Sequence, residues 1–250
     1  MMPWRILLAG LAMMSASAAE AAKPAIVLVH GAFANASGWN RVIAILQRDG
    51  YEVVGVENPL VSLQADIATT KRAVAHFTGP VVLVGHSYGG VVISGAAAGN
   101  PNVKALVFVA AIAPEPGEAV NAFFAKYPSE SSKATTQDVA GFLTVDRNRF
   151  AELFAADVPA DEAALLAATQ KPIRSGNFAA TLRDAAWKTI PSWYVVAKQD
   201  RALNPDLERF YAKRMGAKTS EVDGSHFLFL SHPVEIAKVI EEAAAAAASK

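Results

Sequence analysis

The chain has 250 residues, of which 52% are hydrophobic and 18% are charged, and this predicts one α/β domain with a sizeable core. Lysine plus arginine and aspartate plus glutamate both number 23, so no charge excess indicates nucleic acid or a membrane surface as the partner. The sequence contains no cysteine, which excludes disulfides, a thiolate nucleophile and a cysteine-based metal site.

The first 19 residues have the pattern of a secretory signal peptide. Arg5 precedes an apolar run, 6–14, that is too short to span a bilayer, and small residues with an Ala-Ser-Ala site ending at Ala18 follow. An N-terminal membrane anchor is the alternative. We expect cleavage at the end of this segment, export to the periplasm or the medium, and a mature domain over 20–250 that does not contact the membrane.

The chain then alternates between strands and helices. Apolar runs predict strands over 26–30, 51–56, 81–84 and 103–110. Apolar residues at helical spacing predict intervening helices over 39–46, 63–77 and 91–98. This alternation is typical of a mostly parallel sheet that helices cover on both faces.

The alternation stops after the strand that ends near Ala111. Residues from about 115 to 189 are rich in alanine, contain several aromatics and show helical patterns with no clear strand. Alternation resumes with predicted elements over 192–197 (strand), 205–215 (helix), 218–222 (strand) and 234–248 (helix). We expect the segment 115–189 to form a small helical cap over the carboxyl edge of the sheet, where ligands bind in such folds.

The pentapeptide Gly85-His86-Ser87-Tyr88-Gly89 directly follows the strand predicted over 81–84. It has the Gly-x-Ser-x-Gly pattern of a nucleophile elbow, in the strand–turn–helix setting that the pattern needs. The two glycines leave room for a strained turn, which lifts the Ser87 hydroxyl above the sheet at a helix N-terminus. Ser87 is therefore the predicted nucleophile, and a chance match in a glycine-rich turn is the alternative.

A serine nucleophile needs a base that a third group orients. Among the five histidines, His226 lies in a loop after the last strand, from which it could reach the elbow. The alternative for His226 is a loop histidine bonded to backbone. The others are predicted in a turn (His30), in solvent (His76), inside the elbow pointing away (His86) and at the start of the last helix (His232).

Asp200 is the predicted orienting carboxylate. It follows the strand over 192–197 at the sheet edge, and it lies between Ser87 and His226 in the chain order of such triads. The other acids there are explained by a turn (Asp223), a helix start (Asp206) and solvent exposure (Glu221).

Backbone N–H groups are expected to form an oxyanion hole for the tetrahedral intermediate. We assign one donor to Tyr88 and the other to Ala32, with Phe33 as the rival of Ala32. The predicted substrate-binding side chains are Phe33, Tyr88 and Phe227. Some aromatics of the cap could also line an apolar pocket, although at least half are expected to pack the cap instead: Phe123, Phe124, Tyr127, Phe142, Phe150, Phe154, Phe178 and Trp187. Surface charge explains Arg147, Arg149 and Arg174 better than carboxylate binding does.

These motifs resemble the α/β-hydrolase superfamily, and small bacterial carboxylesterases near the plant methylesterase and hydroxynitrile lyase branch in particular. The resemblance covers nearly the whole mature chain and rests on Val29-His30-Gly31-Ala32, the elbow, Asp200 and Gly224-Ser225-His226. The lyases of that branch have a threonine after the first-strand histidine and a lysine after the catalytic histidine. This chain has Gly31 and Phe227 there, so esterase chemistry is favoured.

The predicted activity is hydrolysis of small, fairly apolar carboxylic esters through an acyl-enzyme on Ser87, without a metal or an organic cofactor. His30 and His226 lack the spacing of a metal site. Use of the same triad on amides, on lactones or in perhydrolysis is the first alternative, and a non-catalytic ligand-binding protein is the second. The oligomeric state is left open.

Overall fold

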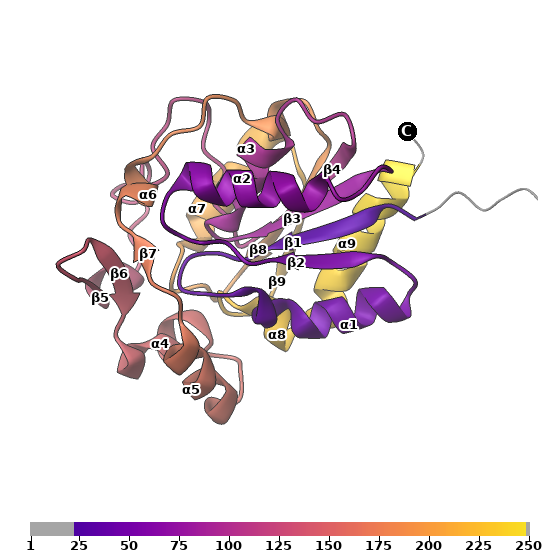
Figure 1. Ribbon diagram of the computed structural model, residues 1–250. Coiled ribbons are helices and arrows are strands. Elements are labelled where there is room, and N and C mark those ends of the chain that lie inside the picture. Colours follow the sequence, from indigo (N-terminus) through magenta and orange to yellow (C-terminus); the bar gives the residue numbers. More distant parts are fainter. Residues whose placement is uncertain (1–22, 249–250) are drawn as a thin grey trace, which may run out of the picture.

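A six-stranded sheet forms the centre of the structure, a computed structural model that describes residues 23–248 (Figure 1). The strands lie in the order β2-β1-β3-β4-β8-β9, and every neighbouring pair is parallel. Their bounds are Ala25–Val29 (β1), Val53–Val56 (β2), Val81–His86 (β3), Val103–Val109 (β4), Ser192–Ala197 (β8) and Lys218–Val222 (β9). The predicted fold class is confirmed. The predicted signal peptide over 1–19 lies outside the described residues and stays a prediction.

The strand order has a switch point between β1 and β3. The chain passes from β1 to β2 on one side and then returns to β3 on the other side. The loops that follow β1 and β3 therefore diverge at the carboxyl edge of the sheet, and ligands of open α/β sheets bind in the crevice between such loops. The elbow follows β3, and the predicted oxyanion loop follows β1.

Helices cover both faces of this sheet (Figure 1). The helices α1 (Asn40–Arg48) and α9 (Pro233–Ala248) lie on one face, and α2 (Leu63–Val74) and α3 (Gly89–Ala97) lie on the other. Helix α7 (Pro205–Met215) packs against β8. Within residues 23–248, no helix combines the length and the apolar character needed to cross a membrane.

Side-chain caps fix where two of these helices begin. The Ser62 side chain accepts a hydrogen bond from the backbone N–H of Ala65 at the start of α2, and Asn204 accepts one from Asp206 at the start of α7. Each such cap stabilises a helix by about 1 kcal/mol. Helix α7 ends at Gly216, whose φ of 62° is left-handed and suits glycine.

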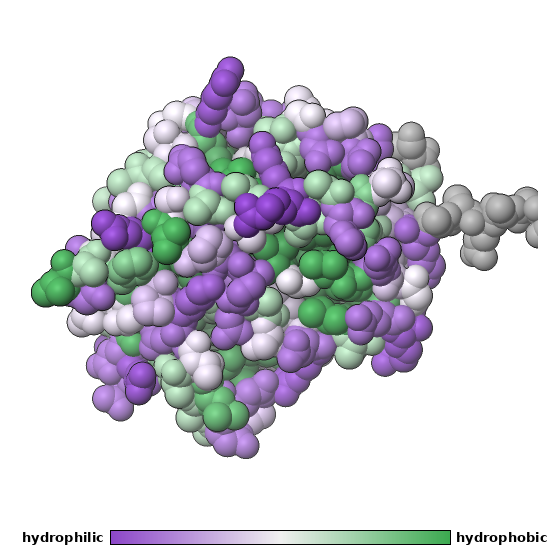
Figure 2. Space-filling model, viewed as in Figure 1, coloured by the Kyte–Doolittle hydropathy of each residue, from purple (hydrophilic) through white to green (hydrophobic). Residues whose placement is uncertain are grey.

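The inner strands carry the core. Every residue of β1 and β3 is buried, as expected of parallel strands that helices cover on both faces. The edge strand β9 instead reads Lys-Thr-Ser-Glu-Val and is partly exposed. Figure 2 shows hydrophilic residues spread over one face of the molecule, with smaller apolar areas between them.

A cap is inserted between β4 and β8 and projects beside the sheet (Figure 1). Its helices and strands are β5 (Thr135–Gln137), β6 (Phe142–Val145), α4 (Arg147–Phe154), α5 (Ala160–Thr169), β7 (Ile173–Arg174) and α6 (Gly176–Ala179), with 3-10 turns over Ser131–Lys133 and Ala186–Lys188. The expectation of a cap without strands is wrong, because β5, β6 and β7 form a three-stranded antiparallel sheet. These strands have two to four residues, too few for alternation to be visible in the sequence.

Candidate active site

Ser87 sits on a strained turn between β3 and α3. Its φ is 54°, in the left-handed region that residues with a side chain rarely adopt. Close packing around the turn explains the glycines. A Cβ at Gly85 would lie 2.6 Å from the Gly89 carbonyl oxygen, and one at Gly89 would lie 2.5 Å from the carbonyl oxygen of Val29. A Cβ at Gly31 would lie 2.6 Å from Cβ of Ser87, so the residue after the first-strand histidine has no room for a side chain here.

His226 and Asp200 form a buried pair. The distance from Nδ1 of His226 to Oδ2 of Asp200 is 2.5 Å, and the two residues are 2% and 6% exposed. The other carboxylate oxygen, Oδ1, accepts hydrogen bonds from the backbone N–H groups of Ala202 at 2.7 Å and Leu203 at 2.8 Å. Both oxygens of Asp200 are thus committed, and the imidazole is fixed with its Nδ1 toward the carboxylate.

One cavity of about 560 Å³ brings this pair to the elbow, because Ser87 and His226 both line it. Nε2 of His226 has no hydrogen-bond partner among residues 23–248, so it is available to accept a proton from a group in the cavity. The structure therefore brings together the three predicted triad residues. Ser87 and His226 line the same cavity, and Asp200 binds His226.

His86 supports His226 from the core side, a role that sequence reasoning missed. It is fully buried, its Nε2 donates a hydrogen bond to the His226 carbonyl oxygen at 3.0 Å, and the two ring centroids are 4.6 Å apart. Burial, and then the nearby His226, hold the pKa of His86 well below its usual value. His86 is therefore neutral, and its side chain packs against His226 and binds the backbone of the loop that carries it.

The loop after β1 and the elbow both have backbone N–H groups that could bind an oxyanion. The backbone N–H groups of Ala32, Phe33 and Tyr88 have no acceptor within the described part of the chain, and Ala32 and Phe33 line the cavity. Phe33 has a φ of 60°, so this loop is strained in the same way as the elbow. Ala32 and its rival Phe33 both stay candidates for the second donor.

His30 stabilises the loop after β1 from its buried side. It is buried, its Nδ1 donates to the carbonyl oxygen of Gly31 at 2.8 Å, and its Nε2 accepts from the backbone N–H of Asn58 at 3.0 Å. Burial lowers the pKa of His30, in keeping with the neutral tautomer that these two bonds require. The prediction that His30 is fixed in the turn is confirmed.

Two predicted substrate-binding side chains lie away from the cavity. The Tyr88 side chain is fully buried, and its hydroxyl donates to Asp66 at 2.8 Å and accepts from Asn177 at 3.0 Å. Phe227 packs in the core, with its ring 5.4 Å from that of His86. Tyr88 and Phe227 each directly follow a predicted catalytic residue, but in a turn or a loop adjacency in the sequence does not fix where a side chain points. Phe33 does line the cavity.

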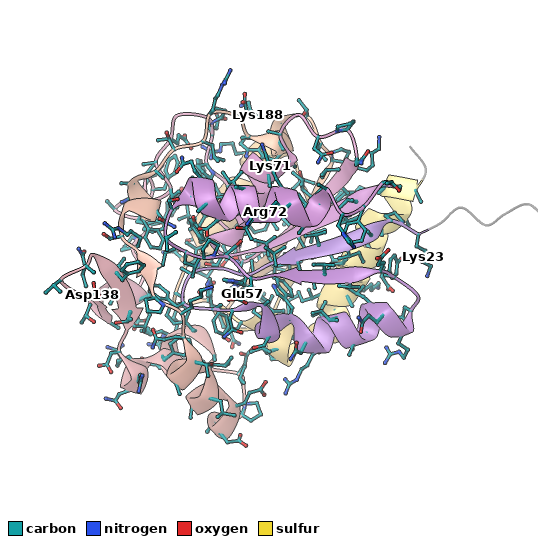
Figure 3. The ribbon with its side chains drawn as sticks, viewed as in Figure 1. Lys23, Glu57, Lys71, Arg72, Asp138 and Lys188 are labelled. Carbon is teal, nitrogen blue, oxygen red and sulfur yellow. The ribbon has the colours of Figure 1, made fainter. Side chains whose placement is uncertain are left out.

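The lining of the cavity is uncharged. Cap aromatics that contribute to it are Phe124, Tyr127, Phe154 and Phe178, and hydroxyls come from Ser129, Ser131, Ser132 and Thr135. None of the residues that line it is Lys, Arg, Asp or Glu. The charged side chains labelled in Figure 3, such as Asp138 on the cap and Lys188, lie on the exposed surface instead. Arg149, a candidate for carboxylate binding, pairs with Glu152 at 2.8 Å.

Glu208 lies buried behind Asp200 and gives a prediction about stability. Its Oε2 accepts from the backbone N–H of Ala197 at 2.9 Å, and its Oε1 has no partner among the described residues. Burial, and then the charge of Asp200, raise the pKa of Glu208 well above its usual value. The folded state thus holds this proton more tightly than the unfolded state, so stability is lost as the pH rises through the raised pKa.

Glu208→Gln removes that ionisation and keeps an oxygen for the Ala197 N–H. It is expected to raise Tm by about 2–4 °C at about pH 8, and by less at about pH 5. Calorimetry of both proteins across this range checks the result. A variant whose Tm is unchanged or lower at the alkaline end would contradict the assignment of a buried, protonated Glu208.

The chain belongs to the alpha/beta hydrolase family, whose sequence pattern it matches over residues 26–239. It is similar to alpha/beta hydrolase nvfD of Aspergillus novofumigatus, with 26% identity over 89% of this chain and 97% of that protein. It is also similar to a pyrethroid hydrolase of Sphingobium wenxiniae, with 24% identity over 89% of this chain and 88% of that protein.

Among solved structures, polyneuridine aldehyde esterase superposes with a TM-score of 0.77 at 19% identity, covering 88% of this chain and 98% of that one. At this identity the superposition shows the shared fold. The resemblance to the α/β-hydrolase superfamily is confirmed.

Proposed function

We propose that this protein is a serine carboxylesterase that hydrolyses small, neutral, mostly apolar esters through an acyl-enzyme. The observation that carries the proposal is the shared cavity: Ser87 and His226 both line it, and Asp200 binds the far side of the His226 imidazole. A nucleophile, a base and an orienting carboxylate in this arrangement suit acyl transfer. The names of two similar proteins, a pyrethroid hydrolase and polyneuridine aldehyde esterase, support hydrolysis of esters.

The proposed reaction has two steps. Oγ of Ser87 attacks the ester carbonyl while Nε2 of His226 takes its proton, and Asp200 stabilises the imidazolium that forms. The backbone N–H of Tyr88, together with that of Ala32 or Phe33, binds the oxyanion. Collapse of the intermediate transfers the proton from His226 to the leaving alcohol. Water, deprotonated by His226, then attacks the acyl-enzyme and releases the acid and Ser87.

Neutrality of the substrate is argued from the walls of the cavity. A charged group that enters an uncharged, mostly apolar cavity loses its hydration and finds no counter-charge. The volume of about 560 Å³ also falls in the range of cavities that enclose small organic ligands. Selectivity is therefore expected to follow charge more strongly than acyl length.

A pair of esters of similar size tests this expectation. The catalytic efficiency kcat/KM for p-nitrophenyl butyrate is expected to exceed that for p-nitrophenyl hemisuccinate, which carries a carboxylate, by at least about 10-fold. Acetate and octanoate esters measured beside them give the length of the acyl site. Equal or faster turnover of the hemisuccinate would overturn the neutral-substrate assignment, and a wild-type protein that cleaves no ester would overturn the esterase proposal. Anilides and lactones in the same assay test the alternative uses of the triad.

A further inference from the structure

A carboxylate of the cap contacts the loop that carries His226. Oδ2 of Asp157, which lies between α4 and α5, accepts hydrogen bonds from the Ser225 backbone N–H at 2.9 Å and from Oγ of Ser231 at 2.7 Å. Its Oδ1 accepts from Oγ of Ser225. Ser225 directly precedes His226, and Ser231 ends the short helix α8 (Leu228–Ser231) that follows it. One side chain of the cap thus binds the loop on both sides of His226.

The end of α4 adds contacts at the same place. The carbonyl oxygen of Phe154 accepts from the Phe227 backbone N–H at 2.9 Å and lies 3.2 Å from Oγ of Ser225, whose single proton is donated to Asp157. The Phe154 ring also meets the His226 imidazole edge to face, with 5.4 Å between their centroids. Cap groups therefore bind the residues before and after His226, while His86 binds its carbonyl oxygen from the core.

The Asp157 carboxylate is ionised at neutral pH. Partial burial would by itself raise its pKa, but the hydrogen bonds from Ser225 and Ser231 outweigh burial and hold the pKa below its usual value. Hydrogen bonds to an ionised acceptor are shorter and stronger than neutral ones. If the carboxylate is removed, the Ser225 N–H, which is buried with its residue, loses its acceptor.

We propose that Asp157 is a positioning residue for His226, so that the cap holds the general base in place as well as enclosing the substrate. The inference rests on the proposed function, in which His226 is that base. Asp157 does not line the cavity, so it acts on the reaction through the loop and not by touching substrate. A base that is displaced by about 1 Å can lose on the order of 100-fold in rate.

The test compares Asp157→Ala with two further variants. Asp157→Ala is expected to lower kcat for p-nitrophenyl butyrate by about 100-fold and to change KM by less than about twofold. Asp157→Asn keeps one oxygen that can accept from the Ser225 N–H but removes the charge, so it is expected to lose about 3- to 10-fold in kcat. The matched control is Asp146→Ala, because Asp146 is also a cap acid that accepts from a backbone N–H, that of Asn148 at 2.9 Å, at the start of α4. It should leave kcat unchanged.

A spectroscopic readout separates this proposal from the proposed function. The proton between His226 and Asp200 is expected far downfield in the proton NMR spectrum of the wild type, and to broaden or vanish in Asp157→Ala through faster exchange with water. That result would support the positioning role even if the wild type cleaved no ester.

Three outcomes would overturn the proposal. They are a folded Asp157→Ala variant with wild-type kcat and an unchanged downfield resonance, a loss that appears only in KM, and an equal loss of kcat in Asp146→Ala. If Asp157→Ala does not fold, Asp157→Asn and Ser231→Ala, which removes one of the hydrogen bonds, answer the same question. Wild-type kcat and resonance in both would overturn it as well.

Discussion

Ser87→Ala is expected to lower kcat for p-nitrophenyl butyrate by about 10⁵-fold, because it removes the oxygen that forms the acyl-enzyme. Alanine keeps the Cβ of serine, so the packing against Gly31 and the φ of 54° are unchanged. Tm should therefore stay close to that of the wild type. The oxyanion donors are backbone groups and survive the substitution, which leaves a small residual rate.

The matched control for this variant is Ser94→Ala. Ser94 is a buried serine of α3 whose Oγ donates to the Gly90 carbonyl oxygen at 2.7 Å, and it does not line the cavity. Its replacement should cost some stability and leave kcat unchanged. A Ser87→Ala protein that retains more than about a tenth of wild-type kcat would contradict the proposed nucleophile.

Asp200→Asn is expected to lower kcat by about 10⁴-fold while the fold is retained. The reason lies in the backbone around the carboxylate. Because the N–H groups of Ala202 and Leu203 point at Oδ1, the carbonyl oxygen of an asparagine must face them, and its NH₂ group must face His226. Nδ1 of His226 would then have to accept, which places the proton on Nε2. The imidazole could no longer take the proton of Ser87.

The control for Asp200→Asn is Asp223→Asn. Asp223 lies in the same region, three residues before His226, but its exposed side chain binds Gln199 at 2.9 Å and does not contact the imidazole. Its replacement should change kcat by less than about twofold. Equal losses in the two variants, or activity retained in Asp200→Asn, would contradict the assignment of Asp200 as the orienting group.

The predicted site residues that the structure brings together follow from local rules. The elbow is a contiguous motif whose glycines pack against backbone atoms, so its turn could be predicted from five residues. Asp200 and His226 follow β8 and β9, and parallel strands bring such positions to one edge of the sheet. The bounds of β8, α7 and β9 also agree with the prediction.

The parts that sequence reasoning missed depend on contacts between distant residues. Asp157 lies 68 positions from Ser225 and 74 from Ser231, so no spacing in the sequence links them. The short strands of the cap exist because they pair with one another, and with two to four residues each they are too short to show alternation in the sequence. The direction of the Tyr88 side chain is set by Asp66 and Asn177, which come from α2 and from the cap.

Covalent trapping with an organophosphate tests the central claim most directly, because it needs an activated serine and no knowledge of the natural substrate. The purified wild-type protein is treated with diisopropyl fluorophosphate and its mass is measured, intact and after digestion. We expect one adduct, on the peptide that contains Ser87, no adduct in Ser87→Ala, and much slower labelling in Asp200→Asn. A folded wild-type protein that stays unlabelled, or that carries the label on another residue, would contradict the assignment of Ser87 as the nucleophile of a serine hydrolase.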